Sequence, residues 1–152
     1  MPGSTGAWRS ICRFVREQIE AQRNLELATQ KAVRKERRVE RKALSLLMSL
    51  LNPQQRQEFR ERRHFYVIGG SSGTRYRIRV GMIANIDVLG DDGKVKYRLC
   101  VTPTGGVPMY DVMAAQLLHL QDCATEEKLL RQANIHPAVS KNRACSRHGA
   151  IV

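Results

Sequence analysis

Hydrophobic and polar residues alternate most regularly between residues 74 and 101, in the runs TRYRIRV, NIDVL and KVKYRLCV. Successive side chains of a β-strand point to opposite faces of the sheet, so each run predicts a strand with one apolar and one polar face. A fourth β-like run, HFYVI, precedes them at residues 64–68. The pattern predicts an antiparallel sheet of three to four strands. The polar face of this sheet would carry Arg75, Arg77, Arg79, Lys94, Lys96 and Arg98.

Short turns join these predicted strands. The sequence GDDG at residues 90–93 is a strong hairpin signal, and residues 81–83 allow a second tight connection. The resulting pairing places Asp87 opposite Arg77 on one side and opposite Lys96 on the other. Since no second acid or base lies nearby in the sequence, we interpret Asp87 as a partner in cross-strand charge pairs and not as a catalytic carboxylate.

Helical patterns flank the predicted sheet. Residues 8–51 contain neither glycine nor proline, which favours one long helix, and Asn52-Pro53 together with Gln55 predicts the capped start of a short second helix. Two amphipathic helices follow the strands, at residues 109–121 and 126–134. The fold class is therefore α+β, with both C-terminal helices packed on the apolar face of the sheet. We predict four segments: a flexible N-terminus (1–7), a long basic helix (8–51), a small α+β domain (52–135) and a mobile basic tail (136–152).

The long helix has a weak heptad repeat. One set of apolar residues recurs at sevens from Ile11 to Leu46 and is interrupted by Gln18, while a second set begins at Phe14 and ends before Lys35 and Lys42. This is a weak coiled-coil seam, and it does not by itself predict dimerisation, although a homo-oligomer through this helix remains an option. The apolar stretch at residues 43–51 must be covered, either by the sheet or by a protein partner. The residues that would bind such a partner are Leu44, Leu47 and Leu51.

The charge of the chain changes the range of expected partners. Its 152 residues carry a formal net charge of +12, with a pI near 10.2. This excess favours contact with nucleic acid (DNA or RNA), an anionic surface or an acidic protein. Residues 1–64 contribute fifteen basic and seven acidic side chains, or +8, whereas the remainder contributes eleven and seven, or +4. The N-terminal half is therefore the more basic.

The basic excess is densest in KAVRKERRVERK, residues 31–42. One interpretation is a solvated helical spacer in which glutamates are interleaved among the basic residues. The other is an arm that binds nucleic-acid phosphates without reading sequence. On the sheet, Tyr76 and Tyr97 fall on the apolar face, so we expect its cationic face to contact the backbone instead of stacking on bases. The phosphate-binding candidates in the helix are Lys31, Arg34, Lys35, Arg37, Arg38, Arg41 and Lys42.

Sequence motifs give no support to enzyme chemistry. The chain contains no GxSxG, HExxH or dinucleotide-binding glycine pattern, and GGSSG at residues 69–73 opens a strand, unlike a Walker loop. A contact between an anion and the exposed amides of this loop remains open. The four cysteines are scattered. His136 and Cys123 could join Cys145 and His148 in a zinc site, but three of these four residues lie in or beside the predicted mobile tail, and their spacing does not favour such a site. We expect no catalytic residue, metal or cofactor, and a cytoplasmic protein without a signal peptide or membrane span.

The motifs TRYRIR, NIDVLGDDGKVKYRLC, DVMAAQLLHLQ and LLRQAN, within residues 64–134, support one resemblance. This part of the chain resembles a small domain found in proteins of unassigned role from bacteria and their phages. The resemblance implies a fold boundary and brings no activity or cofactor. Two functions are compatible with these observations: a non-enzymatic accessory protein that binds nucleic-acid phosphates, or an assembly module, such as a phage component, that docks through its N-terminal helix.

Overall fold

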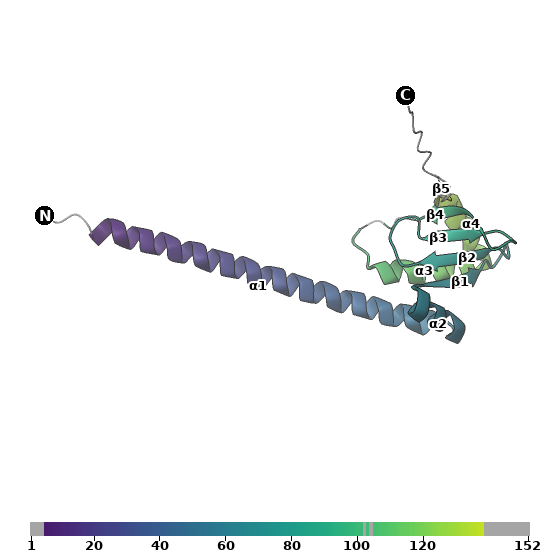
Figure 1. Cartoon of the computed structure of the whole chain (residues 1–152), viewed down its shortest axis with the longest axis horizontal. Helices are drawn as coiled ribbons and strands as arrows, with labels where there is room; N and C mark the ends of the chain where they lie inside the picture. Colours follow the sequence, from purple (N-terminus) through teal and green to yellow (C-terminus); the bar gives the residue numbers. More distant parts are fainter. Residues whose placement is uncertain (1–4, 102, 104, 139–152) are drawn as a thin grey trace, which may run out of the picture. The chain divides into compact units, whose positions relative to one another are not determined.

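The computed structural model describes residues 5–101, 103 and 105–138 and confirms the α+β fold (Figure 1). The chain divides into two compact units within its first helix, between Lys42 and Ala43. The helices are α1 (Thr5–Leu50), α2 (Pro53–Arg62), α3 (Met109–Gln121) and α4 (Cys123–Gln132). The strands are β1 (His64–Ile68), β2 (Arg75–Arg79), β3 (Ile86–Leu89), β4 (Val95–Cys100) and β5 (Asn134–Pro137).

The first unit is the greater part of helix α1. The helix begins at Thr5, three residues before the predicted start, so the predicted flexible segment is helical at residues 5–7, and residues 1–4 lie outside the described residues. Side chains from Arg13 to Val39 are all exposed, as are those of residues 8–10. This part of the helix is therefore formed without a tertiary core of its own, as expected of a sequence free of glycine and proline.

The second unit is built on a five-stranded antiparallel sheet in the order β1-β2-β3-β4-β5. The prediction of three to four strands is corrected by β5, which pairs with residues 97–100 of β4. This strand is short, exposed and ends in a proline, so its sequence lacks the apolar alternation by which strands are recognised. His136 and Pro137, assigned to the mobile tail, belong to β5, whereas residues 139–152 lie outside the part of the chain that the structure describes.

One face of the sheet forms the hydrophobic core with the helices. Strands β1 to β4 bury alternate residues such as Phe65, Ile78 and Leu99 against Leu117 of α3 and Leu129 of α4. The prediction that both C-terminal helices pack on the apolar face is therefore confirmed. Two reciprocal hydrogen bonds, of 2.8 and 3.0 Å, join the buried amides of Asn85 and Gln116 and fix the segment before β3 to α3.

The end of α1 belongs to the same core. Leu47 and Leu51 are fully buried, at 0% and 1% exposure, and Leu44 packs against the cluster from its edge. Leu47 and Leu51 therefore have no exposed surface to offer a protein partner: the apolar stretch needed cover, and the domain of the same chain provides it. Asn52 and Gln55 form the predicted capping box at the start of α2, which places Phe59 in the core.

The strand register was predicted in part. Arg77 pairs with Asp87 across β2 and β3, as the sequence indicated. The expected pairing of Asp87 with Lys96 is wrong by two residues. The turn pairs Leu89 with Val95, one residue beyond Lys94, and a bulge between Val88 and Leu89 shifts the register by one more, which brings Arg98 opposite Asp87. A local irregularity of this kind changes which side chains meet across the strands without changing the alternation of the sequence.

Candidate nucleic-acid interface

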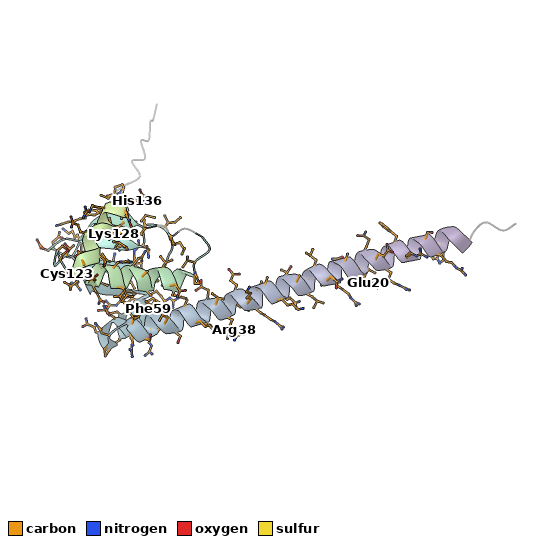
Figure 2. The ribbon with its side chains drawn as sticks, turned by 180° about the vertical axis from the view of Figure 1, so that it is seen from behind. Glu20, Arg38, Phe59, Cys123, Lys128 and His136 are labelled. Atoms are coloured by element: carbon orange, nitrogen blue, oxygen red, sulfur yellow. The ribbon has the colours of Figure 1, made fainter. Side chains whose placement is uncertain are left out.

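The basic segment of α1, residues 31–42, presents a cationic face. Its seven lysines and arginines are all exposed, and Arg38 projects from the helix surface in Figure 2. At about 100° per residue, all seven lie within about 160° of the helix circumference, whereas Glu36 and Glu40 lie on the opposite side. The glutamates are therefore interleaved with the basic residues in the sequence but separated from them in space. This separation yields a surface of one sign, which we call the basic face.

The basic face is long enough to contact several phosphates. Twelve helical residues extend over about 18 Å, and phosphates along one DNA strand follow one another every ~3.4 Å of helix axis. Long flexible lysine and arginine side chains at successive turns can therefore reach phosphate oxygens of a duplex or of a single strand. Contacts of this type give affinity that depends on salt and carry no sequence information.

A second cationic surface lies on the face of the sheet opposite the core. Three arginines from two strands surround the carboxylate of Asp87, which is fully buried. Arg77 Nη2 donates to Asp87 Oδ2 at 2.6 Å, Arg79 Nε to the same oxygen at 2.9 Å, and Arg98 Nε to Oδ1 at 3.1 Å. The predicted charge pair is thus a four-residue cluster, with a formal charge of +2 from three arginines and one aspartate.

The cluster holds its arginines in place while leaving them accessible. The side chains of Arg77, Arg79 and Arg98 are 27%, 34% and 30% exposed to solvent. Burial lowers the pKa of Arg77, but the hydrogen bonds and the charge of Asp87 outweigh it, and the pKa is raised above its ordinary value. Because part of their charge is balanced by Asp87, these arginines bind an external anion less strongly than three free arginines would.

An aromatic group lies on this cationic face, which corrects the expectation that the face has none. Tyr66 pairs with Arg77 across β1 and β2, and the guanidinium of Arg75 lies 4.2 Å from the centre of its ring. His64 packs edge-on against Tyr66, and burial followed by the charge of Arg77 lowers the pKa of His64, so its ring is neutral at pH 7. The alternation of HFYVI could have placed Tyr66 on this face once β1 was paired with β2.

Of the two lysines predicted for this face, Lys94 lies in the β3–β4 turn and Lys96 lies near the start of β4. Lys94 forms an exposed ion pair with Asp92 at 3.4 Å. Val95 pairs with Leu89 of β3, and Tyr97 pairs with Val88. Because Leu89 and Val88 are adjacent, Lys96 lies at the bulge and has no partner residue in β3. Of the predicted sheet residues, the structure gathers Arg77, Arg79 and Arg98 around Asp87, with Arg75 on Tyr66 beside them.

The loop at residues 69–73 does bind an anion, and the anion is the chain's own Glu126. The amides of Ser71 and Ser72 donate to Oε2 at 2.7 and 3.1 Å, and the Ser71 hydroxyl donates to the same oxygen at 2.7 Å. Hydroxyl groups of Ser72 and Tyr76 donate to Oε1. Five donors thus converge on one fully buried carboxylate, so this loop is not free to bind an external phosphate.

These contacts set the protonation of the buried groups. Burial raises the pKa of Glu126, but the hydrogen bonds from Ser72 and Ser71 outweigh it and hold the pKa at about 2. Burial, reinforced by the negative charge of Glu126, raises the pKa of Tyr76 to about 12. At neutral pH the carboxylate is charged and the phenol is protonated, and this combination satisfies both groups. No local sequence signal identifies Glu126, which lies 54 residues after Ser72.

Gly70 locks this loop against the junction of α3 and α4. Its amide donates to the carbonyl of Leu120 at 2.9 Å, and a β-carbon at Gly70 would overlap the backbone carbonyl of Gln121. Replacing Gly70 with alanine is therefore expected to lower the free energy of unfolding by about 2–3 kcal/mol in urea unfolding. The matched control, Gly106→Ala, has open space at its β-carbon and should change it by less than about 0.5 kcal/mol. Equal effects of the two variants would contradict this role of Gly70.

Comparisons with protein-family models, with curated proteins and with solved structures found no match. Among the described residues, no three histidine, cysteine, aspartate or glutamate side chains come together to hold a metal ion. No helix in the described part of the chain is long and apolar enough to cross a membrane. The two cationic surfaces, with their geometry and charge, are therefore the candidate functional features of the described residues.

Proposed function

We propose that this protein is a non-enzymatic accessory protein that binds nucleic-acid phosphates, without marked sequence preference, through the basic face of α1. The observation that carries the proposal is the separation of charge in residues 31–42, where seven exposed basic residues share one side of the helix. A solvated spacer needs only a polar surface and has no requirement for such a one-signed face. Acidic residues on the opposite side leave the basic face free to approach a polyanion.

The sheet face supports this function as a secondary contact. Its arginines are ordered and partly exposed, and Tyr66 offers one ring, but Asp87 balances part of the charge and Arg75 already covers the ring. The alternative function, an assembly module that docks through Leu44, Leu47 and Leu51, has less support because Leu47 and Leu51 are buried in the domain's own core.

The basic face is tested by a variant that neutralises four of its residues. We expect Lys31→Gln, Arg34→Gln, Lys35→Gln and Arg38→Gln together to weaken binding to a mixed-sequence duplex. If each side chain contacts one phosphate, the slope of log K against log salt should fall by about 3–4, at roughly 0.9 per contact. Fluorescence anisotropy of a labelled duplex, and of a labelled single strand, across a salt series measures this slope.

The same helix provides a matched control. Neutralising Arg9, Arg13, Arg16 and Arg23 removes the same charge from equally exposed positions on the same side of α1, N-terminal to residues 31–42. This control should change the salt slope by less than about 1, since it removes only distant charge and no phosphate contact. If the two variants weaken binding equally, the contact is diffuse and the assignment to residues 31–42 is wrong.

A further inference from the structure

The face of the sheet opposite α3 and α4 carries one row of side chains that crosses all five strands. Each residue of the row pairs with the next across two neighbouring strands, so all five side chains lie on the same face. This cross-strand row consists of Tyr66, Arg77, Asp87, Arg98 and His136. The arginine cluster occupies its centre, with one ring at each end. At ~4.8 Å between strands, the row is about 19 Å long.

The first end of the row is formed by Tyr66 together with Arg75. Helix α2 fixes the backbone of Tyr66: Gln55 Nε2 donates to the Tyr66 carbonyl at 2.7 Å, and the Tyr66 amide donates to Glu58 Oε2 at 3.2 Å. The guanidinium of Arg75, an exposed residue, lies 4.2 Å from the centre of the Tyr66 ring and covers one side of it. A guanidinium plane is itself a surface on which nucleic-acid bases stack. Arg75 therefore extends the stacking surface of the ring.

A hollow of about 460 Å³ opens beside Arg75, within the size range of pockets that hold small molecules. It is lined by residues 72–75 on one side and by residues 88–91, 93, 96 and 97 on the other. The ladder between β2 and β3 ends at Tyr76 and Val88, so no ladder pairing closes the sheet at this end. Asp91 and Lys96 give the lining an acceptor and a donor, as hydrogen bonds to the edge of a base require.

We propose that the cross-strand row and the hollow bind a single-stranded nucleic acid that lies across the strands. One unpaired base stacks at the end formed by Tyr66 and Arg75, next to the hollow, and another stacks on His136, which is exposed on the edge strand β5. Sheets that bind single-stranded RNA use aromatic side chains in this way to stack two or three bases. The proposal goes beyond the proposed function, which assigns phosphate contacts to α1, and does not depend on it.

The charge of the row favours a single strand over a duplex or an acidic peptide. Arg77, Arg79 and Arg98 each donate Nε to Asp87, which balances part of their charge. Each guanidinium has five N–H groups and each side chain is partly exposed, so donors remain for a phosphate between two bases. A duplex offers such phosphates but keeps its bases stacked inside, and an acidic peptide has no bases. A single strand matches both the arginines and the rings.

The proposal is tested on the full chain by fluorescence anisotropy with a labelled single strand, as RNA and as DNA, and with the DNA duplex of the same sequence. Tyr66→Leu and His136→Ala each remove one ring. Each variant should lower the affinity for the single strand by about 5- to 150-fold, the effect of one lost base–aromatic stack. The affinity for the duplex should change by less than about twofold, because its bases do not reach the rings. This result with either RNA or DNA supports the proposal.

His119→Ala is the matched control for His136→Ala, since His119 is exposed on α3, on the core side of the sheet. Tyr66→Phe keeps the ring of Tyr66 and loses only its hydroxyl. Both should bind the single strand within about twofold of the wild type. Urea unfolding verifies that Tyr66→Leu is folded, and His136→Ala tests the row independently because His136 is exposed on β5. Losses no larger than that of His119→Ala, or equal losses for the single strand and the duplex, would overturn the proposal.

The same titrations in the fourfold glutamine variant of α1 separate this proposal from the proposed function. Neutralising the basic face should weaken binding of the single strand and of the duplex alike, whereas the row variants should weaken binding of the single strand only. If the full chain does not bind a duplex, the proposed function fails while the effects of Tyr66→Leu and His136→Ala on the single strand remain as predicted. If those two variants have no effect in either background, the cross-strand row does not bind a single strand.

Discussion

Replacing Asp87 with asparagine is expected to lower the free energy of unfolding by about 3–5 kcal/mol, the largest effect anticipated for any single change in the domain. The carboxylate is fully buried and accepts hydrogen bonds from Arg77, Arg79 and Arg98. Asparagine preserves the shape but removes the negative charge, so three half-buried arginines would face one another without a counter-ion. Urea unfolding followed by circular dichroism measures the loss.

The control for this variant is Asp91→Asn, in the exposed β3–β4 turn. It removes the same charge from the same hairpin and should change stability by less than about 0.5 kcal/mol. A second variant isolates the repulsion: adding Arg77→Gln to Asp87→Asn should recover part of the loss, because two arginines repel less than three. If Asp87→Asn is as mild as Asp91→Asn, the cluster does not stabilise the sheet.

Protonation or removal of the Glu126 carboxylate is expected to produce the second large effect. The folded pKa of about 2 lies below the ordinary value of 4.5, so the folded state binds this proton more weakly than the unfolded state. The carboxylate therefore contributes its full stabilisation above about pH 4.5, and this is lost as the pH falls towards 2. The shift corresponds to about 3 kcal/mol.

Glu126→Gln is the variant that tests this contribution. At pH 7 it should lower the free energy of unfolding by about 3 kcal/mol, because the amide cannot accept five hydrogen bonds as the carboxylate does. Between pH 4.5 and 2 the difference from the wild type should shrink, since Glu126 of the unfolded wild type then takes up a proton that the folded state binds only near pH 2. Glu127→Gln, on the exposed side of α4, is the control. A constant difference across this pH range would contradict the assignment.

The fold could be predicted where local patterns decide it. Alternation in residues 74–101 identified three strands, and Asn52, Pro53 and Gln55 identified the start of α2, because these features depend on neighbouring residues alone. Strand β5 escaped prediction because Asn134–Pro137 is held by its pairing with β4 and has no apolar pattern of its own. The bulge between Val88 and Leu89 likewise has no recognisable sequence pattern, although it helps to place Arg98 opposite Asp87.

The candidate site was predictable in charge but not in arrangement. The sequence showed basic residues at 31–42, and helix geometry then separated them from Glu36 and Glu40. In contrast, the binding of Glu126 by Ser71 and Ser72 depends on a tertiary contact between a loop and a distant helix, which no local pattern records. The same limit applies to Leu47, since an apolar helix end predicts a partner without identifying it.

The structure therefore distinguishes charges that serve the fold from charges that remain free. Asp87 balances part of the charge of the sheet arginines, and Glu126 occupies the glycine-serine loop, so two features that suggested anion binding are largely satisfied internally. The basic face of α1 has exposed side chains and no acidic residue among them in space. It is the part of the described chain best suited to an external polyanion.

The most direct test of phosphate binding by this protein is a titration of a labelled mixed-sequence duplex with the full wild-type chain over a salt series. We expect binding at low salt, a log–log salt slope of about −4.5 to −6.3 for five to seven phosphate contacts, and the same affinity for an unrelated sequence. Absence of binding at low salt would contradict this expectation, as would an affinity that depends on sequence but not on salt.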